Sequence, residues 1–492
     1  MRTLALGGRT AVLPPLAALV AVSAFVRARG LGESLWIDEG ISAGIASHGL
    51  GELPGLLRLD GSPPLYYALL HGWIEVAGSG DAALRVPSLV FALLTVPAAL
   101  WLGRSLFGAR AGWLCAVLAA LSPFLTRYAA EARMYALVGL LSTLATGVFL
   151  HAYVQRRRRH AALFAALLTV LLYTHYWALF FALGAAAAFA VLLAGAEPGA
   201  RRRLAADGAL GLLVPSALFA PWAPTLAFQV EHTGAPWSNP PPPAALAGAL
   251  ALAAAAAVLP LLGRGEGERR ALRATAVLAA AALGSAWAAT SIEPGWASRY
   301  LVVLAGPFLL LAAAALARAG APGLAVAAGV LLLWAADGRP AAKSNVEEAS
   351  ARLAAALGPG DLVVSTQPEQ VPVLAHYLPP GVRYATPLGI VSDPRVMDWR
   401  RALDRLERAR ADDVVAPLLA RLAPGATVAL VQPAVGDAAR WRAPWTRAVL
   451  AHAARWEAFL RAHPSLAPLG GGPAPSEATR AGVVVALFRK TV

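Results

Sequence analysis

Long apolar stretches separated by short polar segments dominate the first two thirds of the chain. A helix that crosses a bilayer needs about 20 mostly apolar residues, so the pattern predicts about eleven membrane-spanning helices. The predicted spans are residues 11–26, 83–102, 111–126, 134–153, 161–173, 177–195, 204–222, 244–262, 274–290, 299–317 and 322–336. We therefore expect a polytopic α-helical membrane domain over residues 1–336.

The pattern changes after residue 336, where polar and apolar residues mix as on an ordinary water-exposed surface. Short apolar runs at 361–366, 427–433 and 482–488 predict buried strands. Stretches near 367–378 and 443–462 predict helices between them. This alternation is typical of a small α/β domain, expected over residues 337–492. It shows no phosphate-binding loop and no catalytic motif, so a structural or acceptor-positioning role is favoured over a second catalytic domain.

Composition supports a membrane protein and argues against nucleic acid as a partner. Hydrophobic residues make up 58% of the chain and charged residues 14%, against about 25% charged in soluble proteins. The net charge is +14, but a surface so poor in charge cannot carry an extended nucleic-acid-binding face. The single cysteine, Cys115, excludes a disulfide framework and a cysteine-based metal cluster.

The arginines predict the orientation, because cytoplasmic loops are enriched in positive charge. With the N-terminus in the cytoplasm, 16 arginines fall on inner segments and 7 on outer segments. The C-terminal α/β domain is then extracytoplasmic, and the expected location is the inner membrane of a bacterium. Ten of the 14 acidic residues before residue 337 fall on outer segments. Orientation does not require this clustering, but chemistry on the outer face does.

The first outer loop, residues 27–82, is long and partly apolar, and long ordered loops are usually functional. Asp38 and Glu39 follow an apolar stretch just beyond the first span. A carboxylate held beside apolar walls is a candidate base for removing a proton from a hydroxyl group. A helix N-cap at Asp38, starting a helix over 40–48, is an equally good interpretation.

The same loop contains "PPLYYALLHGW" (63–73), where the prolines favour a helix start. Tyr66, Tyr67 and Trp73 suit the lipid headgroup region. We assign Asp60, Tyr66 and, on a later outer turn, His175 to acceptor or substrate binding. For His175 a polar loop residue is the favoured simpler interpretation.

Two further outer segments carry candidate charges. In "SPFLTRYAAEARMYAL" (122–137), Arg127 and Glu131 are four residues apart and would share a helix face. A simple salt bridge explains that pair but not the additional Arg133 in so short a turn. Arg299 stands at the outer start of the tenth span. It could snorkel to the interface or bind a lipid phosphate through its planar guanidinium.

Several of these segments resemble bacterial glycosyltransferase family 39 proteins. The resemblance rests on "WIDEG", "DGSPPLYYALLHGW", "ALRVPSLVFALLTVPAALWLGRSLFG", "LSPFLTRYAAEARMYAL", "YTHYWAL" and "SRYLVVLAGPFLLL", in order over roughly residues 30–310. That family belongs to the membrane C-type superfamily, with the protein O-mannosyltransferases and the lipid A aminoarabinose transferases as relatives. The C-terminal domain lies outside the resemblance.

The resemblance implies a C-type fold and a polyprenyl-phosphate-linked sugar donor used on the outer face. Asp38 matches the acidic position expected of the catalytic base, and Glu39 completes the paired Asp-Glu motif. Glu131 matches the second outer acidic position, where relatives also carry Asp. Arg299 matches a basic residue near the donor phosphate, and Arg127 or Arg133 could assist it. Some relatives use a divalent metal, for which this sequence shows no diagnostic ligand set.

Together these features predict an integral-membrane glycosyltransferase. Asp38 would deprotonate an acceptor hydroxyl on a glycan, lipid or protein, and the sugar would be transferred with inversion. Two alternatives stay open: a lipid-linked glycan flippase or other transporter, and a ligase that uses a diphosphate-linked donor. A transporter predicts ionisable residues in mid-span and inverted repeats, whereas here the charges cluster on one face.

Overall fold

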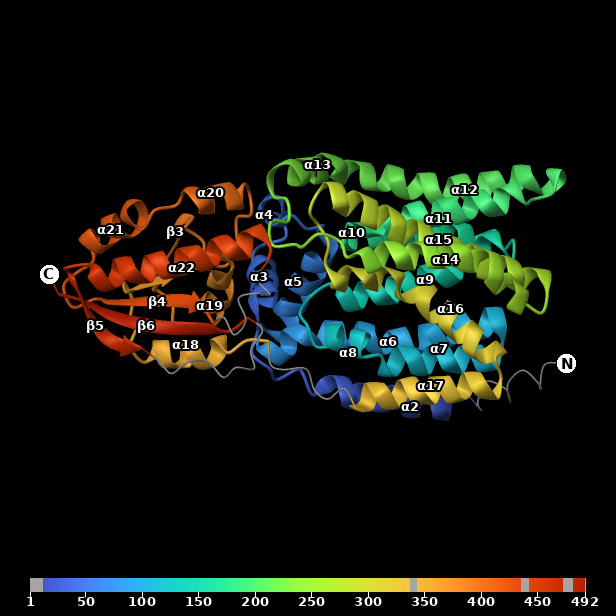
Figure 1. Ribbon diagram of the computed structural model, residues 1–492, viewed down its shortest axis with the longest axis horizontal. Helices are drawn as coiled ribbons and strands as arrows, with labels where there is room; N and C mark the ends of the chain where they lie inside the picture. Colours follow the sequence, from blue (N-terminus) through green and yellow to red (C-terminus); the bar gives the residue numbers. More distant parts are fainter. Residues whose placement is uncertain (1–11, 337–342, 435–441, 472–480, 492) are drawn as a thin grey trace.

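The computed structural model describes residues 12–336, 343–434, 442–471 and 481–491. Two regions follow one another in the chain: a helical part, residues 12–336, and a C-terminal part, residues 343–491, which contains a β-sheet. They lie at opposite ends of an elongated molecule (Figure 1).

Apolar helices coincide with all eleven predicted spans. They are α2 (Leu13–Ala28), α6 (Asp81–Phe107), α7 (Ala109–Leu121), α9 (Tyr135–Tyr153), α10 (Arg159–Thr174), α11 (Ala178–Ala194), α12 (Pro198–Phe219), α14 (Pro243–Val258), α15 (Glu266–Ile292), α16 (Ala305–Arg318) and α17 (Ala321–Ala336). By length and composition, six helices among the described residues are able to cross a membrane. A seventh span is formed if α7 and α8 (Pro123–Ala129), bent by 54°, count as one. The other four apolar helices are shorter. The prediction of a polytopic helical membrane protein is confirmed.

Short helices occupy the segments that the sequence predicts to be outer loops. The first outer loop contains α3 (Ile37–Ala46), α4 (Leu53–Asp60) and α5 (Leu65–Ala77). The later outer segments add α13 (Ala223–His232), which continues α12 through η1 (Ala220–Trp222), and η3 (Ser298–Leu304), which leads into α16. η2 (Leu259–Leu262) extends α14. Helices α3, α4 and α5 lie between the long helices and the C-terminal part (Figure 1).

The C-terminal part contains a six-stranded mixed sheet with the order β3-β2-β1-β4-β6-β5. Its strands are β1 (Leu362–Ser365), β2 (Arg383–Thr386), β3 (Gly389–Val391), β4 (Thr427–Pro433), β5 (Leu466–Gly471) and β6 (Val483–Lys490). β1 pairs in parallel with β2 and β4, and the other three pairings are antiparallel. The three predicted strands correspond to β1, β4 and β6. β1 and β4 are buried along their whole length, which explains why they read as continuous apolar runs.

Helices pack around this sheet. They are α18 (Val346–Ala354), η4 (Pro368–Gln370), α19 (Val371–Tyr377), α20 (Ala402–Arg408), α21 (Ala411–Arg421) and α22 (Pro444–Ala462). α19 and α22 correspond to the two predicted helices. Apolar residues recur along one face of α22, and Trp445, Val449, Trp456 and Leu460 are all buried there, as expected of an amphipathic helix lying on a sheet.

Close contacts hold the C-terminal part against the first outer loop. Asp81, at the start of α6, accepts hydrogen bonds from His376 (3.0 Å) and Tyr377 (2.5 Å) of α19. His48 lies 2.6 Å from the carboxylate of Asp393. A Cβ atom added to Gly40 of α3 would lie only 2.6 Å from Val373. The backbone of α3 therefore approaches the C-terminal part as closely as glycine allows.

Candidate active site

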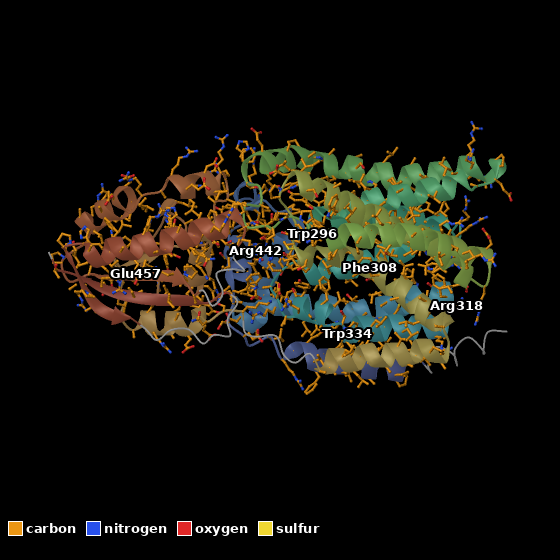
Figure 2. All side chains as sticks on the ribbon, in the orientation of Figure 1. Trp296, Phe308, Arg318, Trp334, Arg442 and Glu457 are labelled. Carbon is orange, nitrogen blue, oxygen red and sulfur yellow. The ribbon has the colours of Figure 1, made fainter. Side chains whose placement is uncertain are left out.

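A large cavity lies where the outer segments meet the C-terminal part. Its volume is 1420 Å³, above the range of about 300–1,000 Å³ that is usual for small-molecule sites. Five of the nine predicted site residues line it: Asp38, Asp60, Arg133, His175 and Arg299. The C-terminal part contributes lining residues too, among them Glu369 and Arg442. Arg442 lies at the junction of the two parts (Figure 2).

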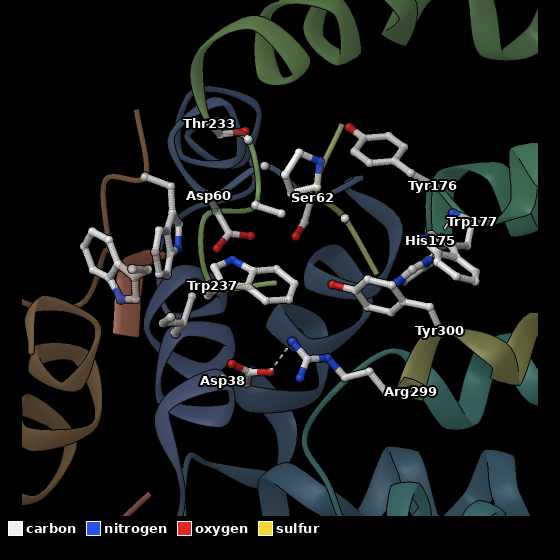
Figure 3. A pocket seen from close by; sticks show the side chains of 18 of the residues that line it. Asp38, Asp60, Ser62, His175, Tyr176, Trp177, Thr233, Trp237, Arg299 and Tyr300 are labelled. Atoms are coloured by element: carbon white, nitrogen blue, oxygen red, sulfur yellow. Dashed lines mark hydrogen bonds and ion pairs between the residues drawn. The ribbon is translucent and has the colours of Figure 1, made fainter. Parts of the chain in front are cut away.

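Asp38 and Arg299 face each other across this cavity (Figure 3). Arg299 Nη2 lies 3.5 Å from Asp38 Oδ2, and the two side chains are 21% and 18% exposed. This carboxylate oxygen has no hydrogen-bond partner among the described residues. The Arg299 guanidinium also lies over the rings of Trp237 (4.9 Å) and Tyr300 (5.4 Å). The pair is thus an ion pair without a tight hydrogen bond, which leaves both charges able to engage a ligand.

The start of helix α3 places Asp38 in the cavity. The N-cap of α3 is Trp36, not Asp38, so the N-cap interpretation of Asp38 is wrong. Asp38 is the second helical residue, and two side chains donate hydrogen bonds to its backbone carbonyl rather than to its carboxylate. Those bonds come from Ser42 Oγ (2.9 Å) and Arg133 Nη1 (3.3 Å).

Arg133 ties α3 to the rest of the site. Its Nη1 also donates to Ser42 Oγ at 2.9 Å and to the Tyr67 hydroxyl at 3.4 Å. Tyr67 in turn donates to Asp60 Oδ2 at 3.0 Å. Burial raises the pKa of Asp60, and the positive charge of Arg133 opposes that rise. Arg133 therefore holds the Asp38 backbone and Asp60 in one hydrogen-bonded network.

Glu39 points away from the cavity and forms a buried ion pair with Arg85. Arg85 Nε and Nη2 donate to the two carboxylate oxygens, each at 2.7 Å. The backbone N–H of Ala132 donates to Glu39 Oε1 at 2.7 Å. The side chains are only 2% (Arg85) and 1% (Glu39) exposed. Glu39 thus joins α3 to α6 and to the 130–134 turn, and it does not line the cavity. Its expected catalytic role, to position the acceptor or tune Asp38, stays a prediction.

Glu131 is also buried outside the cavity lining. Its Oε1 forms an ion pair with Lys343, and its Oε2 has no partner among the described residues. Burial raises the pKa of Glu131, and Lys343 opposes the rise. The expected helix face shared with Arg127 does not form, because α8 ends at Ala129. Arg127 is exposed on α8 and does not line the cavity.

Of the two ring-bearing residues predicted to bind substrate, Tyr66 and His175, only His175 lines the cavity. Tyr66 is buried against Tyr67 and does not line the cavity, so the geometry gives no support to its predicted role in acceptor binding. Neither tyrosine is exposed to lipid headgroups, because both are buried inside the protein. His175 lines the cavity between the rings of Tyr135 and Tyr300. Its Nδ1 accepts the Trp177 backbone N–H at 3.1 Å. Burial, with Arg133 and Arg299 nearby, lowers the pKa of His175 to about 3.

Several charged residues of this region were not predicted as site residues, among them Arg85, Lys343, Glu369 and Arg442. Arg85 is one of the seven arginines on predicted outer segments, and no sequence signal places it opposite the Asp-Glu motif. Lys343 lies beyond the resemblance and gives no signal either. Glu369 lies in η4, four residues after the end of strand β1, and a polar residue near the carboxyl end of a predicted parallel strand is a usable signal.

Metal ligands do not gather in the described residues. No group of three or more His, Cys, Asp or Glu side chains converges there, and Asp38 faces an arginine rather than a second carboxylate. This donor set does not fit a divalent metal.

Comparison with known proteins supports the family resemblance. Residues 61–225 match the family model described as dolichyl-phosphate-mannose-protein mannosyltransferase. Among curated proteins the chain has no significant sequence match.

Solved structures share the fold over most of the chain. ArnT from Cupriavidus metallidurans, in the apo state, is 16% identical with a TM-score of 0.50, covering 97% of this chain and 98% of ArnT. Its structure bound to undecaprenyl phosphate is 15% identical, with the same score and coverage. The oligosaccharyltransferase of Archaeoglobus fulgidus in the apo form is 11% identical with a TM-score of 0.56, covering 85% of this chain and 69% of that one.

Proposed function

We propose that the chain is a membrane C-type glycosyltransferase that transfers a sugar from a polyprenyl-phosphate donor to an acceptor hydroxyl group. The match of residues 61–225 to a mannosyltransferase family model and the fold shared with ArnT support this proposal. The observation that carries the proposal is the Asp38–Arg299 pair, which places a carboxylate and a guanidinium together in a cavity at the outer ends of the helices. Transfer needs one group that accepts a proton and one that stabilises a departing phosphate.

Arg299 is assigned to the donor phosphate. Guanidinium groups bind phosphate through two parallel hydrogen bonds, and Arg299 stands where apolar helix α16 meets the cavity. A prenyl chain could follow the apolar helices while its phosphate reaches Arg299. The relative ArnT is known with undecaprenyl phosphate bound, which supports a donor of this class. Arg133 adds positive charge nearby but is engaged with α3.

Asp38 is assigned as the base. Its carboxylate takes the proton of the acceptor hydroxyl while that oxygen forms a bond to the anomeric carbon. The bond from this carbon to the phosphate oxygen breaks with its electron pair, and polyprenyl phosphate leaves. Arg299 stabilises the phosphate charge, so no acid is needed to protonate the leaving group. Attack opposite the leaving group inverts the anomeric configuration.

The orientation is part of the same proposal. The C-terminal part and the cavity face the extracytoplasmic side of a bacterial inner membrane. Arg318, an expected inner residue, lies at the end of the helical part remote from the C-terminal part (Figure 2), which supports this orientation. The partners are then the lipid donor, the surrounding membrane lipids and a hydroxyl acceptor on a glycan, lipid or protein.

The test uses the full chain in nanodiscs with a panel of radiolabelled polyprenyl-phosphate sugars. Sugar transfer or release is followed for wild type, Asp38→Asn and the control Glu75→Gln, whose carboxylate is exposed on the same outer loop. We expect Asp38→Asn to lose about 10²-fold or more of the turnover, the usual contribution of a general base, and the control to lose none. Turnover of Asp38→Asn within a few-fold of wild type would overturn the base assignment.

A further inference from the structure

The segments that follow strands β1 and β4 of the C-terminal part lie at the cavity. From β1 the chain goes through α19 to β2 on one side, and it later returns to β4 on the other side of β1. β1 and β4 are parallel neighbours, so their carboxyl ends form a point where the strand order reverses. In α/β sheets ligands bind in the crevice at such a point. Gln367 and Glu369 after β1 and Ala434 after β4 line the large cavity there.

Glu369 is held with one oxygen open. Its Oε1 accepts hydrogen bonds from Trp445 Nε1 (2.8 Å) and Gln367 Nε2 (2.9 Å). Its Oε2 is buried and has no partner among the described residues, and the residue as a whole is only 5% exposed. A buried carboxylate oxygen without a partner is costly, and here it belongs to a residue of the cavity wall. The arrangement fixes the carboxylate and leaves one acceptor for a ligand.

The charges of the cavity select the chemistry of that ligand. Oε2 accepts a hydrogen bond, so the ligand supplies an O–H or an N–H group. Three arginines (Arg133, Arg299 and Arg442) and four carboxylates (Asp38, Asp60, Glu293 and Glu369) line the same cavity, so its charges nearly balance. A neutral ligand that carries hydroxyl groups fits this lining. The partly exposed aromatic side chains of Trp237 and Tyr300 also line the cavity.

We propose that Glu369 and the strand ends beside it form the acceptor subsite, and that the acceptor recognised there is a carbohydrate. This inference rests on the proposed transfer reaction. Glu369 Oε2 accepts a hydrogen bond from a hydroxyl of the acceptor glycan other than the one that reacts. The reacting hydroxyl is thereby directed toward Asp38 on the helical side of the cavity, whose volume of 1420 Å³ leaves room for a donor head and an acceptor together.

The experiment separates acceptor binding from donor chemistry. Full-length wild type, Glu369→Gln, Glu369→Asp and the control Glu407→Gln, an exposed carboxylate of the same part, are compared in nanodiscs. Donor turnover with water as acceptor is measured first. Transfer is then measured to three probes: mixed oligosaccharides from acid-hydrolysed cell envelope, a serine- and threonine-containing peptide mixture, and diacylglycerol. Tryptophan fluorescence during oligosaccharide titration reports binding without turnover, and melting temperatures report folding.

We expect transfer to the oligosaccharides, with the acceptor KM raised about tenfold or more in Glu369→Gln, since a hydrogen bond to a charged group contributes about 1.5–3 kcal/mol. Donor KM, water turnover and the control are expected to stay unchanged, with Glu369→Asp intermediate. An unchanged acceptor KM in a folded Glu369→Gln protein, or transfer only to peptide or diacylglycerol, overturns the inference. If wild type shows no donor turnover at all, the proposed function is contradicted instead. The fluorescence titration then still shows whether oligosaccharide binding depends on Glu369.

Discussion

Arg299 and Asp38 lie 3.5 Å apart although about 260 residues separate them in the sequence. Asp38 is on the first turn of α3 in the first outer loop, and Arg299 begins the segment that leads into α16. The carboxylate of Asp38, which we assign to the acceptor hydroxyl, and the guanidinium of Arg299, which we assign to the donor phosphate, therefore neutralise each other. Donor phosphate that takes over the guanidinium leaves the Asp38 carboxylate free to accept a proton, so donor binding and base activation are linked.

Replacing Arg299 tests the donor side of this relationship. Arg299→Met removes the charge and should lower kcat/KM for the donor by about 10²-fold, as the loss of one preorganised donor group does in other enzymes. Arg299→Lys should recover part of it, because lysine keeps the charge but not the planar fork. Steady-state kinetics with varied donor measure both. Arg29→Met, an exposed outer arginine, serves as control, and an equal loss there would contradict the assignment.

The buried pair of Glu39 and Arg85 gives a prediction about folding rather than chemistry. Breaking such a pair strands a buried charge and costs about 3–5 kcal/mol. Arg85→Met should therefore lower the melting temperature strongly, and Glu39→Gln combined with Arg85→Met should be less destabilised than Arg85→Met alone. Arg270→Met, from an exposed pair with Glu266, should change little. A double variant as unstable as the sum of the single variants would show that the two side chains do not act together.

The layout of the fold could be predicted because it follows from local patterns. The eleven apolar helices and the strands β1, β4 and β6 are continuous apolar segments, and their type is fixed by length and flanking residues. Strands β2, β3 and β5 were missed. They are short or lie toward the sheet edges, and β2 begins with an exposed arginine, Arg383, so little distinguishes them from loops.

The residues of the candidate active site could be predicted only where a charged side chain stands on a segment predicted to be on the outer face. Asp38 and Arg299 are of this kind, and the structure brings them together. Glu39 and Glu131 carry the same charge on the same face, but each is paired with a cation distant in sequence, Arg85 and Lys343. Which carboxylate faces the cavity depends on tertiary packing, and no spacing in the sequence encodes it.

Glycine in α3 is predicted to be required for docking of the C-terminal part. A Cβ atom at Gly44 would overlap the backbone carbonyl of Arg395, and overpacking costs about 1–3 kcal/mol. Gly44→Ala should lower the melting temperature and speed proteolysis between the two parts. Gly55→Ala is the matched control, because it lies in α4 with open space around its Cβ position. Equal protease sensitivity of the two variants would contradict close docking at α3.

His175 gives a prediction about pH. Its folded-state pKa, about 3, lies below the value of about 6.5 for an unfolded chain. Between these values the unfolded state binds the proton and the folded state does not, so this residue makes stability fall as pH falls below about 6.5. At pH 5 the loss is about 2 kcal/mol, at about 1.4 kcal/mol per unit. The buried carboxyls Asp60 and Glu131, whose pKa values are raised, act in the opposite direction.

Comparison with His175→Gln isolates the histidine, because those carboxyls are present in both proteins and cancel in the difference. Melting temperatures in detergent at pH 7.5, 6.5 and 5.0 should fall more steeply for wild type than for His175→Gln. The gap should open only below about pH 6.5. Parallel curves would mean that the imidazole is protonated in the folded protein, which is incompatible with its burial beside Arg133 and Arg299. The Trp177 N–H bond to Nδ1 gives the same expectation, since that nitrogen must then be unprotonated.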